Sequence, residues 1–564
     1  MELLEPFLPR THIAYFSMEV ALRDEMHTYA GGLGILAGDT VRSCADLEIP
    51  VVFVALVSHL GYFRQMIDTE GRQHEAPDAW DASRWCSKLG AMVAVECDGR
   101  PVWIRPWLYI HTNIQQHSIP VLLLDTDLDQ NAADDRSLTN RLYGGDALYR
   151  LKQEIVLGIG GVRLLRALGF EIDTYHLNEG HAALLGLELL RHWKTKSSSP
   201  SCDDTAYDVH AVREHCVFTT HTPVEAGHDC FPYALVERCV PGFIDLPTLK
   251  SLSGEDALNM TRLALNLAGY INGVARRHAE TTQRMFPGYQ IHSITNGVHA
   301  QTWVHPSFAK LFDIAVPQWR HEPEALLRAV NLSDETIATC HQSAKSDLIS
   351  YVRDSTGVVL DPRLPVVGFA RRMTGYKRPL LLFTDVEALL DIAGRHPFQI
   401  VVAGKAHPLD HDGKQAIAEI NGLISRMRGK LTCAFVPEYS MQVAKALVAG
   451  ADVWLNTPMP PLEASGTSGM KAALNGVLNL SVLDGWWIEA CMEGETGWSI
   501  GAPGDDPRQH ASELYRKLDR EVLRLYYDDS LRWRRMMKQA IAYIGSMFNS
   551  QRMMRRYASE AYLR

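Results

Sequence analysis

The sequence lacks several features that would mark whole classes of protein. Its 10 cysteines contain no C-x-x-C pair, which removes the usual signal of a zinc ribbon or a thioredoxin-like redox site. It has no H-E-x-x-H motif and no P-loop. Positive charge is not in excess, because 56 Lys and Arg residues face 66 Asp and Glu residues. A duplex-binding protein would usually show the opposite balance, so nucleic acid is not an expected partner.

Long apolar segments are also missing. The longest, at residues 49–60, has about half of the ~20 residues that a membrane-spanning helix needs. The N-terminus carries Glu2 and Glu5 where a signal peptide would carry Lys or Arg. Scattered cysteines in a chain of this size are typical of reduced, buried residues. We therefore expect a cytoplasmic protein that does not bind membranes.

The chain of 564 residues is too long for one hydrophobic core, since such cores stop growing at about 250–300 residues. Short β-branched runs alternate with helical patterns in both halves. This alternation predicts two doubly wound α/β domains that face each other across a cleft at the ends of their strands. We expect domains over 1–300 and 301–528, and a C-terminal helix over 529–564 that packs back on the first.

The predicted elements come from local patterns alone. The polar, Ser-rich segment Lys194–Asp208 is predicted to be a surface excursion. Glycines 158, 160 and 161 stand inside a helical pattern and predict close helix packing. The clearest predicted strands are Ile13–Ser17, Val51–Leu56, Thr174–Asn178, Val366–Ala370 and Gln399–Gly404. Predicted helices include Ile35–Leu47, Tyr149–Leu168, His181–Trp193, Pro379–Ala393 and Gly413–Met427.

A loop rich in glycine and hydroxyl residues precedes a predicted helix at residues 463–471 (EASGTSGMK). Glycines permit a tight turn, and backbone N–H groups at a helix start bind anions. Lys471 would lie in the first helical turn, where a cation is unfavourable for the helix dipole. Either this is an ordinary surface loop with an exposed lysine, or the lysine lies in a cationic, phosphate-binding pocket. In the second case its pKa is depressed, as an amine that binds an aldehyde requires.

Two further cationic segments follow predicted strands of the same sheet. Residues 371–378 (RRMTGYKR) come after Val366–Ala370, and Lys405 comes after Gln399–Gly404. Each segment alone would pass as a basic surface turn. Because the carboxyl ends of parallel strands meet at one sheet edge, the three cationic features together favour a phosphate-binding site.

The first half offers weaker signals. The glycine loop at 31–34 (GGLG) does not fit the dinucleotide pattern G-x-G-x-x-G. His181 and His221 lie at junctions between a strand and a helix, where a single histidine is more often structural than catalytic. A calcium loop opening at Asp125 fails, since Gln130 stands at its turn position and Arg136 at its closing ligand. We expect no metal site.

Together these segments carry a family resemblance. EASGTSGMKAALN, at 463–475, resembles the pyridoxal-phosphate signature of the α-glucan (glycogen, starch and maltodextrin) phosphorylases. The resemblance covers residues 12 to 560, and YFSME at 15–19 and DGWW at 484–487 point to the short bacterial and archaeal branch. Further similar segments follow in the same order: GGLGILA at 31–37, LNEGH at 177–181, NGVA at 272–275, TNGV at 295–298 and AGKA at 403–406.

The resemblance implies a GT-B fold and phosphorolysis of terminal α-1,4-glucosidic bonds, with release of glucose 1-phosphate and retention of configuration. The implied cofactor is pyridoxal 5′-phosphate, whose phosphate acts as acid and base beside the substrate phosphate. The implied partners are inorganic phosphate, glucose 1-phosphate and an α-1,4-glucan, and family habit would allow a homo-oligomer. The chain begins near the first motif, so we expect no control through the N-terminal regulatory region of the long forms.

Residue roles are carried over by motif. Lys471 would hold the cofactor covalently, Arg372 and Lys377 would hold the two phosphates, and His221 would lie near the reacting sugar. The other implied cofactor contacts are Gly466, Thr467, Ser468, Gly469, Lys405 and Tyr439. The other implied substrate contacts are Glu463, Ala464, Ser465, Gly466, Asn296, His181, Gly31, Gly32 and Gly34.

Two segments depart from the family pattern, and two rival interpretations exist. Thr374-Gly375 replaces His-Glu in the clamp, and Val436-Pro437-Glu438 precedes Tyr439 where Glu-Asn is usual. One rival is a nucleotide-sugar-dependent α-glucan synthase on the same fold. It would carry E-x7-E, but Lys471 replaces the second Glu and has no acceptor for ribose hydroxyls. The other is a catalytically inactive glucan-binding protein, which would be expected to lose some of the key residues.

Overall fold

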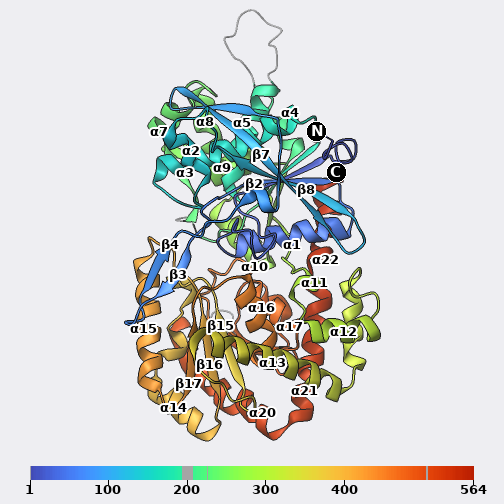
Figure 1. Ribbon diagram of the computed structural model, residues 1–564, viewed down its shortest axis with the longest axis vertical. Helices are drawn as coiled ribbons and strands as arrows, with labels where there is room; N and C mark the ends of the chain where they lie inside the picture. The colour runs from blue at the N-terminus through green and yellow to red at the C-terminus, as the bar shows by residue number, and fades with distance from the viewer. Residues whose placement is uncertain (1, 194–206, 225–226, 503–505, 564) are drawn as a thin grey trace, which may run out of the picture.

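The computed structural model describes residues 2–193, 207–224, 227–502 and 506–563 (Figure 1). Two lobes, each a β-sheet covered by helices, are stacked along the long axis of the molecule. The predicted fold class, two Rossmann-like α/β units of GT-B type, is confirmed. The domain limits at residues 300 and 528 stay predictions. Most of the predicted excursion Lys194–Asp208 lies outside the described residues.

The first lobe is built on a ten-stranded sheet of order β14-β13-β10-β9-β1-β2-β8-β7-β5, with β6 beside β7. The strands from β14 to β8 are parallel, whereas β7 runs antiparallel to β5, β6 and β8. The chain order reverses at β1, which pairs with both β2 and β9. The bounds are β1 Ile13–Ser17, β2 Val51–Leu56, β5 Ser87–Lys88, β6 Val93–Cys97, β7 Arg100–Thr112, β8 Ser118–Asp125, β9 Thr174–Asn178, β10 Cys216–Thr219, β13 Tyr270–Gly273 and β14 His292–Ser293.

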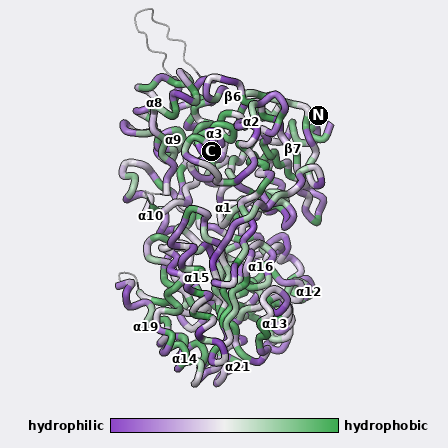
Figure 2. The backbone as a smooth tube through the Cα atoms, turned by 60° about the vertical axis from the view of Figure 1, so that its left-hand side comes forward, coloured by the Kyte–Doolittle hydropathy of each residue, from purple (hydrophilic) through white to green (hydrophobic). Residues whose placement is uncertain are grey.

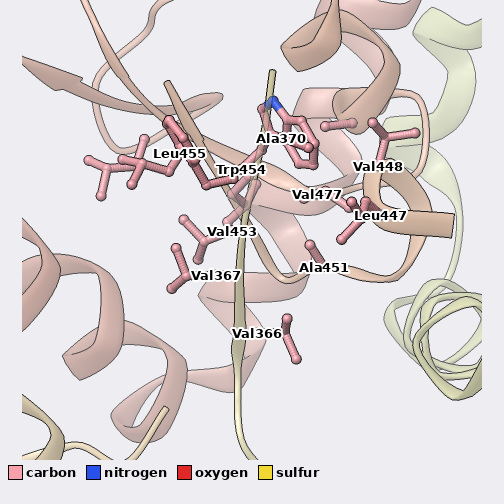
Figure 3. Close-up of a cluster of buried hydrophobic side chains, with 14 of the residues drawn as sticks. Val366, Val367, Ala370, Leu447, Val448, Ala451, Val453, Trp454, Leu455 and Val477 are labelled. Atoms are coloured by element: carbon pink, nitrogen blue, oxygen red, sulfur yellow. The ribbon is translucent and has the colours of Figure 1, made fainter. Parts of the chain in front are cut away.

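The second lobe is built on a six-stranded parallel sheet of order β17-β16-β15-β18-β19-β20. Helices cover both faces, so its strands are almost entirely buried, and most of them appear in the sequence as largely apolar runs. Figure 3 shows this core, with Val366 and Val367 from β15 and Val453 from β18. The bounds are β15 Val366–Ala370, β16 Gln399–Ala403, β17 Thr432–Val436, β18 Val453–Asn456, β19 Leu478–Val482 and β20 Gly497–Ile500.

Helices pack on both sheets, and hydrophobic segments are concentrated in the middle of each lobe (Figure 2). Close packing at the internal glycines is confirmed: a Cβ on Gly158 would lie 2.7 Å from the backbone nitrogen of Leu185. The main helices of the first lobe are α1 Gly32–Asp46, α3 Ala147–Ile155, α4 Gly161–Ala167, α5 Leu184–His192 and α10 Arg276–Met285. Those of the second include α13 Asp334–Thr356, α14 Val386–Arg395, α15 His411–Met427, α16 Met441–Gly450 and α17 Ser468–Ala473. No helix in these described ranges is both long and apolar enough to cross a bilayer.

Two predicted helices differ from the structure. The helix expected to start at Pro379 is α14, which begins at Val386 because Asp385 caps it by accepting from the backbone N–H of Ala388. Just before Pro379 the chain turns at Arg378, whose φ of 47° is left-handed. The C-terminal helix is also interrupted, since Asn549 caps a new helix by accepting from the N–H of Arg552.

The chain crosses between the lobes at two adjacent points. Helix α21 (Ser530–Gln539) lies in the second lobe, and α22 (Ser550–Tyr557) packs against α1 of the first (Figure 1). The Ser43 and Ser550 hydroxyls are 2.6 Å apart at that contact. The two crossing segments pair with each other, since Val298 N–H donates to the Phe548 carbonyl at 3.0 Å and Ser550 N–H donates to the Val298 carbonyl at 2.9 Å.

A hairpin of the first lobe reaches the second lobe. Strands β3 (Arg64–Ile67) and β4 (Gln73–Ala76) extend toward α15 (Figure 1). The Gln73 amide donates to the Ala406 carbonyl at 2.9 Å and accepts from the Ala406 N–H at 3.0 Å. The Gln65 amide donates to the Gly404 carbonyl at 2.8 Å. Through these bonds the first lobe holds the loop that follows β16 in the second lobe.

Candidate active site

A cavity of about 350 Å³ lies between the lobes, with walls from both. It is at the carboxyl ends of the parallel strands, where ligands of doubly wound sheets bind. The predicted site residues that line it are Gly31, Gly32, His221, Asn296, Arg372, Lys377, Lys405, Tyr439, Glu463, Ala464, Ser465, Gly466, Thr467, Ser468 and Lys471. The structure thus gathers most of the predicted residues around one space.

Lys471 is buried in the short helix α17, and its ammonium lies 3.9 Å from the centre of the Trp303 ring. Burial lowers the pKa of Lys471 from 10.5 to about 8, although the Asp39 carboxylate opposes the shift. The depressed pKa agrees with the sequence prediction, but its main cause is desolvation and not neighbouring cations. Gly466 allows the preceding loop to turn, since its φ is 74°.

Glu463 lies between two cations of the segment after β15. Its carboxylate accepts from Lys377 Nζ at 2.6 and 2.5 Å and from Arg371 Nη2 at 2.7 Å. Burial raises the pKa of Glu463, but the charges of Lys377 and Arg371 outweigh it and the pKa is lowered overall. The backbone N–H of Glu463 donates to Asp484 at 2.8 Å, which holds this end of the loop. Glu463 is therefore ionised and oriented at neutral pH.

Several polar atoms at the cavity have no partner among the described residues. They are Nε and Nη1 of Arg371, which lines the cavity beside Arg372, and Oδ1 of Asn296. Arg372 reaches the glycine loop, because a Cβ built on Gly31 would lie 2.9 Å from its Nη2. Buried polar groups are normally hydrogen-bonded, so these groups fit a site that a polar ligand completes.

His221 is held by the turn that follows β9. Its backbone N–H donates to Glu179 Oε2 at 2.7 Å, and its ring Nε2 is 2.6 Å from Asn178 Oδ1. Burial lowers the pKa of His221 to about 3, with smaller contributions from His278, His176 and His181. The ring is therefore neutral at physiological pH.

The unusual residue before Tyr439 has a defined partner. Glu438 pairs with Lys405, and its other oxygen accepts from the Gln65 backbone N–H of the β3–β4 hairpin. Lys405 also donates to the Phe63 carbonyl at 2.9 Å. Burial raises the pKa of Tyr439 to about 12, and Arg371 opposes this. The Glu438 side chain is thus used at the junction between the lobes.

Three predicted site residues do not line the cavity. A Cβ on Gly34 would lie 2.7 Å from Glu19 Oε2, and one on Gly469 would lie 2.7 Å from the Trp486 ring, so both glycines allow close packing. His181 faces Asp229, with Nε2 3.6 Å from Oδ2, and burial lowers the pKa of His181 to about 3. Their assigned contacts with cofactor and substrate stay predictions.

Sequence reasoning did not single out several residues that contribute to the site. Arg371 was visible only as part of a basic run, and its role beside Glu463 could not be separated from that of Arg372. Trp303 and Tyr62 line the cavity from segments without a local signal. Asn178 and Glu179 stand within the LNEGH segment, so the motif marked their position but not their contact with His221.

Comparison with known proteins agrees with this geometry. A sequence model of the carbohydrate phosphorylase family matches residues 246–497. A maltodextrin phosphorylase of Thermococcus litoralis is 37% identical, over 98% of this chain and 70% of that protein. A glycogen phosphorylase of Mycobacterium tuberculosis is 36% identical, over 98% and 71%. A glycogen phosphorylase of Aquifex aeolicus is 34% identical, over 98% and 86%. The chain belongs to the carbohydrate phosphorylase family, and it is a phosphorylase.

Proposed function

We propose that this phosphorylase cleaves terminal α-1,4-glucosidic bonds of an α-glucan with inorganic phosphate and releases glucose 1-phosphate with retained configuration. The relatives named as maltodextrin and glycogen phosphorylases support the substrate class. The observation that carries the proposal is a buried lysine of depressed pKa in the same cavity as Arg371, Arg372 and Lys377.

The cavity fits pyridoxal 5′-phosphate as cofactor. Lys471 supplies an amine with a pKa of about 8, low enough to react with an aldehyde near neutral pH. Nε and Nη1 of Arg371, which have no partner in the described part of the chain, supply buried donors for a phosphate. When bound, this group supplies a phosphate that can exchange a proton with the substrate phosphate. We assign Lys471 to covalent attachment, and Gly466, Thr467 and Ser468 to the loop around the cofactor.

The cations at the end of β15 have two tasks in this proposal. Two phosphate groups repel each other strongly in a cavity that excludes water, so they need positive charge between and around them. Arg372 and Lys377 provide it from the second lobe. Lys377 also binds Glu463, and it can share its three N–H donors between that carboxylate and a phosphate. The charge of Glu463 therefore holds the ammonium in place while the phosphate binds.

The sugar-binding side of the cavity carries polar groups, of which Glu463 is charged. Asn296 and His221 come from the first lobe, and Glu463, Ser465 and Gly466 come from the second. Asn296 Oδ1 is an unused acceptor among the described residues, which suits a sugar hydroxyl. Closing these groups around one glucosyl unit would exclude water from the bond that breaks, and phosphate would then be favoured over water as the attacking group.

A comparison of donors tests the proposal against the synthase alternative. The purified protein is given a maltodextrin primer with glucose 1-phosphate, UDP-glucose or ADP-glucose, and chain extension is measured. We expect extension from glucose 1-phosphate only, and glucose 1-phosphate from primer plus inorganic phosphate. Extension from a nucleotide sugar alone would overturn the proposal. An absorbance spectrum before and after borohydride reduction separately reports whether the cofactor is bound at Lys471.

A further inference from the structure

Glu179 adopts a backbone conformation that normally belongs to glycine. It follows β9, and its φ of 78° and ψ of 167° lie in a region almost restricted to Gly. A non-glycine residue is strained in this region and persists there only where the surrounding structure holds it. Glu179 is 6% exposed, and its carboxylate accepts from three donors: Gly180 N–H at 2.9 Å, His221 N–H at 2.7 Å and Thr222 Oγ1 at 2.9 Å. The carboxylate of this strained residue therefore fixes the segment that carries His221.

The neighbouring Asn178 contacts the ring of the same histidine. Its side chain is fully buried, with Oδ1 2.6 Å from His221 Nε2 and Nδ2 3.1 Å from Ser17 Oγ. The orientation of this amide follows from Ser17, whose hydroxyl donates to the Glu19 carbonyl at 2.8 Å. Because that hydroxyl hydrogen is already used, Ser17 Oγ can only accept from Asn178, so Nδ2 faces Ser17 and Oδ1 faces His221.

This orientation determines which ring nitrogen of His221 carries the proton. An amide oxygen can only accept, so Nε2 must be the N–H nitrogen. The ring is neutral, so Nδ1 carries a lone pair. Nδ1 has no hydrogen-bond partner among the described residues, and His221 lines the cavity. The chain of bonds from Glu19 through Ser17 and Asn178 thus ends in an acceptor at the cavity wall.

We propose that Asn178 and Glu179 are positioning residues that hold His221 in its Nε2–H form, with Nδ1 accepting a hydrogen bond from one hydroxyl of the bound glycosyl unit. The inference rests on the proposed function, because it takes a sugar to be the ligand. The proposal also predicts substrate specificity, because His221 Nδ1 in the cavity wall can only accept a hydrogen bond and therefore favours a hydroxyl group that donates one. It disfavours a deoxy position, which leaves Nδ1 unpaired, and a carboxylate, which meets its lone pair.

The test combines enzyme variants with substrate analogues. Phosphate release from glucose 1-phosphate and from its 2-, 3-, 4- and 6-deoxy analogues is measured with a maltodextrin primer at pH 8. We expect the wild type to lose at least ~10-fold in kcat/KM with the analogue that lacks the hydroxyl facing His221. The Asn178→Leu variant should reduce that particular discrimination to about 3-fold or less, since the ring is no longer held.

Asn178→Asp provides a matched comparison. Leu and Asp both lose the donor to Ser17, but only Asp keeps an acceptor for Nε2, so only Asp should keep the discrimination. Burial holds the pKa of His221 at about 3, so a rise of ~1–3 units caused by the new carboxylate leaves the ring neutral at pH 8. Equal loss in both variants, or no loss in Asn178→Leu, would overturn the proposal.

Two further variants separate positioning from folding. Asn131 has a buried side-chain amide in the same lobe, which accepts from the Trp103 N–H and donates to the Trp103 carbonyl. Asn131→Leu should therefore leave the discrimination between the analogues unchanged. Glu179→Gln has one acceptor oxygen in place of two, and it should lower kcat/KM about 10-fold while KM for phosphate stays within 2-fold. A parallel change of discrimination in Asn131→Leu would contradict the proposal. A wild type inactive with every donor would instead refute the proposed function.

Discussion

Covalent capture of pyridoxal phosphate by the apoprotein should depend on pH in a way set by the burial of Lys471. Only the neutral amine reacts with an aldehyde. A pKa of about 8 leaves ~10% of the amine neutral at pH 7, whereas the ordinary value of 10.5 would leave ~0.03%. Burial therefore speeds capture at pH 7 by a factor of ~300. We expect the rate to rise tenfold per pH unit below pH 8 and to level off above it.

The assay is stopped-flow absorbance of apoprotein mixed with pyridoxal phosphate from pH 6 to 10. Lys471→Met removes the amine and should show no capture. Lys405→Met removes another lysine of the same cavity, one that pairs with Glu438, and should keep the pH at which the rate levels off. A wild-type rate that still rises tenfold per unit between pH 8.5 and 10 would refute the reasoning, because it would place the pKa near its ordinary value.

The same shift has a consequence for the stability of the apoprotein. Between pH 8 and 10.5 the unfolded chain keeps the Lys471 proton while the folded protein has released it. The unfolded state binds more protons in this window, so stability rises with pH there, by up to ~3 kcal/mol. The difference between wild type and Lys471→Met in urea unfolding isolates this contribution from other groups that titrate in the same range.

Further substitutions, some with a control, have expected outcomes. Lys377→Met should lower kcat for glucose 1-phosphate release by ~10²–10³ while cofactor absorbance is retained, because one cation is lost beside two phosphates; an unchanged kcat would contradict its role. Glu489 of the second lobe accepts from Arg276 N–H at 3.0 Å and from Thr295 Oγ1 at 2.9 Å in the first. Glu489→Gln should therefore lose about 1–2 kcal/mol in urea unfolding, whereas Glu280→Gln, on an exposed pair with Arg277, should change it little. Glu438→Ala leaves Lys405 without its carboxylate, so we expect a lower Tm. Glu438→Gln keeps an acceptor for the Gln65 N–H but not the charge, so it should restore only part of the lost Tm. Equal Tm values for wild type and both variants would argue against this junction.

The sequence predicted the elements whose causes are local. Strands β1, β2, β9 and β15 have the predicted bounds. β1, β2 and β15 are short, largely apolar runs buried throughout, and β9 is buried from Tyr175 onward. The helix after β15 was placed too early, since the left-handed turn at Arg378 depends on its bonds to the Thr457 and Pro458 carbonyls. The break before α22 depends on Val298, which is about 250 residues away in the chain and pairs with Asn549.

The residues of the candidate site also fall into those that a local sequence pattern predicts and those that only the fold brings together. Glycine loops and basic runs mark their own positions, so residues such as Gly31, Arg372 and Lys471 were found. Trp303 lies against Lys471 although the two residues are far apart in the chain, and no local pattern predicts this contact. The difference between Arg371 and Arg372 also needed the structure, since it is the first that binds Glu463. Glu438 departs visibly from the family pattern, but its partner Gln65 lies in the other lobe, so no local pattern predicts their contact.

The paired crossing at Val298 and Asn549 acts as a pivot. Both connections between the lobes pass through one hydrogen-bonded point, so any rotation of one lobe against the other would have that point as its pivot. Contacts close to the pivot, such as the packing of α22 on α1, move little in such a rotation. The β3–β4 hairpin lies on the opposite side of the molecule from α22 (Figure 1), away from that point. Its bonds to the loop at 404–406 would break first on opening and form last on closing, so the position of Lys405 depends on how far the lobes have closed.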